Sequence, residues 1–138
     1  MEIDNYSFPE DLLYDREHSW VRIDGNVAVI GLSDFGQELA GEIVFAELPR
    51  VGREIVFGEP FMSLESGKWV GRIKAIVSGT ILEVNEELEW ESTLINTDPY
   101  GAGWFAKVEL AGEPQGLMKA TDPEFAAFIA AEREKYDK

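Results

Sequence analysis

Cysteine is absent from the chain of 138 residues, and histidine occurs once, as His18. Without cysteine the chain cannot form a disulfide, use a thiolate nucleophile or bind zinc through sulfur, so any redox group has to come from a cofactor. One histidine leaves little for acid–base catalysis, and we interpret His18 as structural. A Walker-type phosphate loop, a dinucleotide fingerprint and calcium-loop spacing are missing as well. We therefore expect no catalytic residue, no metal site and no enzymatic activity of the chain alone.

Positive charge is also scarce. The chain has 12 basic and 27 acidic residues, which gives a formal net charge of -15. Such a chain repels nucleic-acid phosphates, so we expect no nucleic-acid partner, whereas basic protein surfaces would attract it. No apolar run is long enough to span a membrane, and no charged segment followed by an apolar one marks a leader. We therefore expect a cytoplasmic protein with no membrane contact.

The length indicates one compact domain, and turn residues divide most of it into short apolar segments. We expect residues 1–15 to form an extended N-terminal arm and residues 16–138 to form a single domain. Asp34 to Ala40 is typical of a short helix with Asp34 as its cap, ended by Gly41. Strands are expected at residues 20–23, 27–32, 42–48, 55–57, 61–65, 69–77, 80–84 and 104–110.

The C-terminal segment has a helical pattern. Asp122 can cap a helix whose first residue is Pro123, and apolar residues after it recur at helical spacing. Many short strands and one terminal helix predict a mainly β protein, a sandwich or flattened barrel with helical additions.

One lysine lies at the tip of a predicted hairpin. Ser66-Gly67-Lys68 indicates a tight turn between two strands, so the Lys68 side chain would extend away from the sheet. A lysine amine can form an amide, which removes its charge and lengthens the side chain into an arm. A solvated lysine in a turn would have the same spacing, so spacing alone leaves both interpretations open.

Four segments in order resemble the glycine cleavage H-protein family. Glu65-Ser66-Gly67-Lys68 is similar to its lipoyl-lysine turn, Glu-Ser-x-Lys, and His18-Ser19-Trp20-Val21 to its His-Glu-Trp-Val. Residues 31–49 resemble its longest signature, and Asp98-Pro99-Tyr100-Gly101-Ala102-Gly103-Trp104 its Asp-Pro-Tyr-Gly-x-Gly-Trp. The resemblance implies a lipoyl-domain-like β-sandwich of two related halves (a barrel-sandwich hybrid). It also implies lipoic acid in amide linkage to Lys68, which would carry out thiol–disulfide exchange.

Three positions depart from the family. The resemblance places Ser19, Phe35 and Arg72 in the cleft that receives the loaded arm, where H-proteins have Glu, His or Tyr, and Asp or Glu. Ser19 lacks the family's carboxylate, and Phe35 replaces a polar ring with an apolar one. Arg72 replaces an acid with a cation, which repels the cationic methylamine group that a loaded H-protein carries. The three changes weaken a site for that cargo.

The residues around Lys68 also resemble a second group. Gly67-Lys68-Trp69-Val70-Gly71 is similar to the lipoate-binding proteins of bacterial sulfur oxidation, relatives of the H-proteins. We expect Glu65, Ser66 and Gly67 to shape the turn, and Trp69 and Arg72 to line the resting place of the arm. Trp69 could equally fill the surface of an edge strand. Lys74 is the alternative attachment site, although it lies within a strand pattern.

Three hypotheses for function follow. The preferred one is a lipoyl carrier that serves a heterodisulfide-reductase-like complex of sulfur oxidation. The alternative is a glycine cleavage H-protein, whose partners are glycine decarboxylase, aminomethyltransferase and dihydrolipoyl dehydrogenase, and which carries an aminomethyl group. Both carriers need a lipoate ligase or lipoyl-assembly enzymes. The third is a binding module without lipoic acid.

Overall fold

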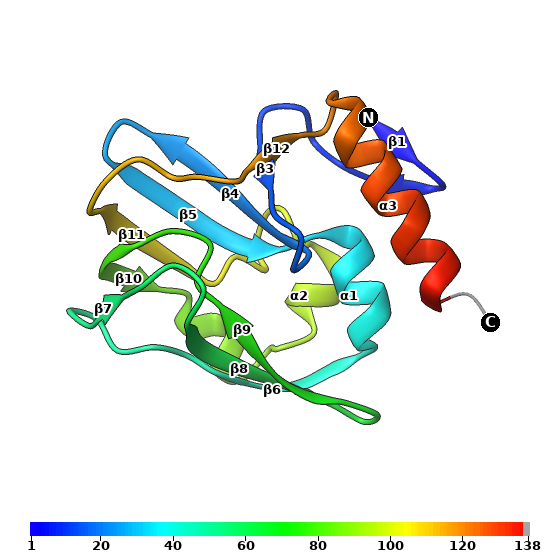
Figure 1. Ribbon diagram of the computed structural model, residues 1–138. Coiled ribbons are helices and arrows are strands. Elements are labelled where there is room, and N and C mark those ends of the chain that lie inside the picture. Colours follow the sequence, from blue (N-terminus) through cyan, green and yellow to red (C-terminus); the bar gives the residue numbers. More distant parts are fainter. Residues whose placement is uncertain (137–138) are drawn as a thin grey trace.

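The structure, a computed structural model, describes residues 1–136 as two main antiparallel β-sheets and a small two-stranded one, β1-β2, with helices at one end (Figure 1). The larger sheet has seven strands in the order β12-β3-β4-β5-β11-β10-β7, and the smaller has three in the order β6-β8-β9. The strands of the larger sheet are β3 (Leu13–Tyr14), β4 (Ser19–Asp24), β5 (Val27–Leu32), β7 (Glu54–Ile55), β10 (Gly79–Val84), β11 (Ala106–Leu110) and β12 (Met118–Lys119); those of the smaller are β6 (Ile43–Glu47), β8 (Pro60–Ser66) and β9 (Val70–Lys74).

The two sheets share one hydrophobic core. Ile30 of β5 and Val108 of β11 belong to the same buried cluster as Leu64 of β8 and Ile73 of β9. Their burial follows from the period-2 alternation of the strands, which turns one face of each sheet inward. The predicted mainly β, lipoyl-domain-like sandwich is confirmed. No helix within residues 1–136 has the length and apolar character needed to cross a membrane.

The helix α1 (Asp34–Ala40) connects the two sheets and has the bounds expected from the sequence. Its cap differs from the expectation, because the Ser33 side chain accepts a hydrogen bond from the Gly36 N–H at 3.1 Å. Serine and aspartate are both good caps, so two adjacent candidates could not be separated by residue type. The short helices η1 (Glu86–Glu89) and α2 (Leu94–Thr97) have no sequence period and were not expected.

A second core lies under the C-terminal helix α3 (Pro123–Tyr136), which begins at the predicted residue. Phe125 of α3 is 5.0 Å from Phe8 and 4.8 Å from Tyr14 between ring centroids. Residues 1–15 therefore differ from the extended arm expected from the sequence. They form β1 (Glu2–Ile3), β2 (Tyr6–Ser7) and β3, and they bury Phe8, Leu12 and Tyr14 against α3.

Candidate functional site

The hairpin between β8 and β9 carries Lys68 at its tip, as the sequence predicts. The Ser66 N–H donates to the Trp69 carbonyl at 2.7 Å and closes the turn. The Ser66 hydroxyl accepts from the Lys68 N–H at 3.3 Å and donates to the Trp69 carbonyl at 3.4 Å. Ser66 is 6% exposed, so its hydroxyl fixes the turn from inside, while Glu65 lies on the exposed face of β8.

Gly67 precedes Lys68 in the turn and has an ordinary backbone conformation. Its φ lies outside the left-handed region, and a Cβ there would meet no atom within 4 Å. The turn therefore does not require glycine at this position. A larger residue could therefore stand beside Lys68 without a clash at its Cβ.

Lys68 is exposed, and its aliphatic chain lies over Gly41 at the end of α1. A Cβ at Gly41 would be 2.7 Å from Cε of Lys68 and 3.5 Å from its Nζ, and Gly41 has φ +83°. Gly41 is thus needed both for its backbone conformation and for the passage of the lysine. In the sequence, Gly41 is recognisable only as a helix end, because its contact with Lys68 is long-range.

Two hollows flank this lysine and share Leu39 and Tyr136. We name the first, of about 350 Å³, the lysine hollow, because Lys68 itself lines it together with Phe35. We name the second, of about 290 Å³, the arginine hollow, because Arg72 lines it. Ser19, Trp69 and Arg72 all line the arginine hollow, so two of the three expected cleft positions meet there, whereas Phe35 lies in the lysine hollow.

Trp69 folds back over its own strand. A Cβ at Gly71 would lie 1.9 Å from Cζ2 of Trp69, so the missing side chain is what seats the indole. Trp69 keeps 39% of its surface exposed, and this surface borders the arginine hollow. The indole thus provides an apolar wall beside the lysine.

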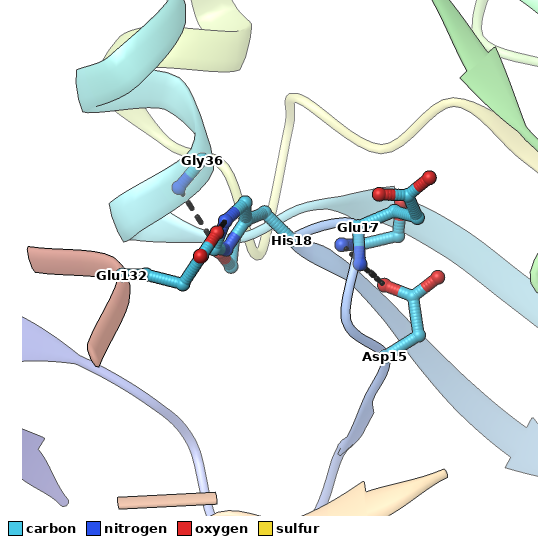
Figure 2. Close-up of polar contacts among 7 residues, drawn as sticks. Asp15, Glu17, His18, Gly36 and Glu132 are labelled. Atoms are coloured by element: carbon cyan, nitrogen blue, oxygen red, sulfur yellow. Dashed lines mark hydrogen bonds and ion pairs between the residues drawn. The ribbon is translucent and has the colours of Figure 1, made fainter. Parts of the chain in front are cut away.

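His18 forms part of the wall of the arginine hollow and links it to α3 (Figure 2). Its Nε2 lies 2.7 Å from Oε1 of Glu132, and both side chains are mostly buried. Burial lowers the pKa of His18, although hydrogen bonding to Glu132 opposes that shift. Nδ1 of His18 and Oγ of Ser19 are buried with no hydrogen-bond partner in the described chain. The structural role expected for His18 agrees with this position.

The loop before His18 is held by Asp15, which Figure 2 shows beside Glu17. Oδ1 of Asp15 accepts the N–H of Glu17 at 3.0 Å and that of Ser19 at 2.9 Å. These bonds support the left-handed backbone of His18, whose φ is +68°. Burial raises the pKa of Asp15 to about 6, against the opposite effect of the two hydrogen bonds.

The charged side chains that line the arginine hollow are Glu17, Arg72 and Lys74, whose sum is positive, unlike the net charge of the chain. Lys74 and Glu17 form an ion pair at 3.1 Å and offset each other. Arg72 has neither an ion-pair nor a hydrogen-bond partner within residues 1–136, so its guanidinium is free to face a ligand. The hollow therefore favours a neutral or anionic group over a cation.

The comparisons with known proteins agree on one protein family. The model of the family described as "Glycine cleavage H-protein" matches residues 12–129. The glycine cleavage system H protein of Herpetosiphon aurantiacus is 48% identical over 116 residues, 84% of this chain and 90% of that protein. Its counterpart from Carboxydothermus hydrogenoformans is 50% identical over 116 residues, 84% of this chain and 88% of that protein. A crystal structure of the Mycobacterium marinum glycine cleavage system H protein has a TM-score of 0.82 at 33% identity and covers 89% of this chain and 99% of that one.

Proposed function

The chain belongs to the glycine cleavage H-protein family, and on this premise we propose that Lys68 holds its lipoyl group. The resemblance inferred from the sequence is confirmed: the protein is a lipoyl carrier with covalent lipoic acid, and it is not itself a catalytic enzyme. Its bound dithiolane supplies thiol–disulfide exchange chemistry. The chain itself positions that group and presents it to other enzymes.

The position of the amine supports Lys68 as the attachment site. Lys68 is exposed at a hairpin tip, its stem rests on Gly41, and two hollows lie within reach of an extended arm. Lys74, the alternative site, lies on β9 and pairs with Glu17 at 3.1 Å. An acylating enzyme can approach a tip without displacing a strand, so the geometry favours Lys68.

We propose the glycine cleavage system as the client. The relatives that carry this name are 48% and 50% identical over most of their length. The comparisons therefore favour the alternative of the two clients inferred from the sequence, and they give no support to the preferred sulfur-oxidation complex. Glycine decarboxylase, aminomethyltransferase and dihydrolipoyl dehydrogenase are the corresponding partners, and a lipoate ligase or lipoyl-assembly enzymes would modify Lys68.

One observation keeps the sulfur-oxidation client as a second candidate. In the arginine hollow, the charges of Lys74 and Glu17 cancel in their ion pair, and the guanidinium of Arg72 remains. The hollow therefore attracts an anion and repels a methylammonium group. A sulfur-containing cargo that carries negative charge would suit it.

Two experiments separate these proposals. Apo-protein is incubated with lipoate ligase, lipoic acid and ATP, and wild type is compared with Lys68→Arg and with Lys74→Arg as the matched control. Peptide mass spectrometry should find the lipoyl group in wild type and Lys74→Arg only. Modification of Lys68→Arg would contradict the site, and an absence of modification in wild type would favour the binding module without lipoic acid.

The lipoylated protein is then incubated with glycine decarboxylase and glycine labelled at its α-carbon, because the carboxyl carbon leaves as carbon dioxide. Incorporation of label into wild type supports the glycine cleavage client. If only Arg72→Glu incorporates label, the charge of the hollow excludes that cargo, and the sulfur-oxidation client is favoured.

A further inference from the structure

A third hollow, of about 480 Å³, lies around η1 and shares no residue with the hollows beside Lys68. We name it the tryptophan hollow, and its apolar lining includes Trp90, Leu82 and Val51. We propose that it is a docking surface for a basic patch on the enzyme that loads the carrier. This inference rests on the proposed function.

Three apolar residues of the tryptophan hollow are unusually exposed. Trp90 is 72% exposed, Val51 63% and Leu82 43%. Single exposed apolar residues are normal on a protein surface, but these three gather around one concavity. Tryptophan is the residue type most enriched among those that dominate binding energy at protein interfaces, so Trp90 is the natural centre of such a contact.

Trp90 is presented by a rigid segment. The backbone N–H of Trp90 donates to the Glu87 carbonyl at 3.2 Å. Leu88, two residues before Trp90, is fully buried in the core that the two main sheets share. The Asn85 amide, at the start of the segment, donates to the carbonyls of Ala102 at 2.6 Å and Trp104 at 2.9 Å. A backbone held in this way needs little ordering when a partner binds the Trp90 side chain.

The tryptophan hollow also has an acidic lining. Glu86 and Glu87 line it, and neither carboxylate has an ion-pair partner within residues 1–136. Glu83 forms an ion pair with Lys107 at 3.5 Å. Protein interfaces usually combine apolar and polar residues, and the negative charge of these glutamates selects lysine and arginine on the other side.

The same charge argues against a second copy of this chain as the occupant. A symmetric dimer through the tryptophan hollow would bring Glu86 and Glu87 against their own copies, on molecules that each carry a net charge of -15. A basic enzyme surface meets no such repulsion. Because the hollow is separate from Lys68, the enzyme can hold the carrier there while the arm reaches its active site.

The test measures loading of lipoylated protein by glycine decarboxylase and glycine, with carrier concentration varied. Trp90→Ala and the double variant Glu86→Gln/Glu87→Gln are compared with wild type and with Phe57→Ala, an exposed aromatic residue outside this hollow. We expect Trp90→Ala to raise the carrier KM by about tenfold or more at unchanged kcat, as loss of a central interface residue does. The glutamine variant should raise KM less and weaken its dependence on salt.

The outcomes separate the two proposals. If wild type is loaded and Trp90→Ala has the same KM as Phe57→Ala, the proposed docking surface is wrong, whereas the glycine cleavage system remains the client. If wild type is not loaded, the proposed client is wrong and the docking inference is overturned with it. Thermal unfolding of Trp90→Ala should match wild type, because the side chain is mostly exposed, and this separates docking from misfolding.

Discussion

Asp15→Asn should make the protein more stable at neutral pH. Burial raises the pKa of the Asp15 carboxyl from 3.8 to about 6 in the folded protein. The folded state therefore binds a proton between about pH 4 and pH 6 that the unfolded state has released. Stability from this group is present below that interval and is lost as the pH rises through it, because the ionised carboxylate is less favourable in the fold than in water.

The size of the effect follows from the shift. A difference of about two pKa units corresponds to about 3 kcal/mol at 1.36 kcal/mol per unit. Asparagine retains an oxygen that can accept the N–H groups of Glu17 and Ser19 but carries no charge. We expect Asp15→Asn to raise the free energy of unfolding by about 3 kcal/mol at pH 8 and to leave it nearly unchanged at pH 4.

The assay is urea unfolding of both proteins at several pH values between 4 and 8, at constant ionic strength. Asp11→Asn, an exposed aspartate on the same segment, is the control for a general change in net charge. The difference between Asp15→Asn and wild type should grow with pH, whereas that for Asp11→Asn should stay small. A constant difference across the range, or a loss of stability at pH 8, would refute the account of this loop.

Three further predictions concern packing around the arm and the second core. Gly41→Ala should cost about 1–3 kcal/mol in urea unfolding, because of its positive φ, and should slow lipoylation of Lys68 in a timed mass-spectrometric assay; unchanged values in both would contradict their contact. Gly71→Ala should displace the Trp69 indole and shift the tryptophan fluorescence, and an identical spectrum would show that the indole does not rest on β9. Phe125→Ala should destabilise by about 3–5 kcal/mol in thermal or urea unfolding, and a loss below about 1 kcal/mol would contradict the second core.

Local signals in the sequence were sufficient for several elements. The turn at Ser66 to Lys68 and the start of α3 at Pro123 lie where turn and capping residues place them. Such features depend on residues close together in the chain, so their chemistry is visible in the sequence. The cap of α1 was misplaced by one residue, because Ser33 and Asp34 are both suitable acceptors.

Long-range packing was not visible in the same way. Phe8 and Tyr14 are buried against Phe125, more than a hundred residues later, and nothing in residues 1–15 alone indicates that partner. The resting place of Lys68 on Gly41 and the link between His18 and Glu132 are hidden for the same reason. Residue types and spacing identified the lysine, whereas its surroundings required the fold.

The proposed function depends most on what the amine of Lys68 carries in the living cell. Full-length protein isolated from its native host, digested and analysed by tandem mass spectrometry, should contain a lipoyl amide on the peptide that includes residue 68. Native protein with an unmodified Lys68, or with the lipoyl group on Lys74, would contradict it.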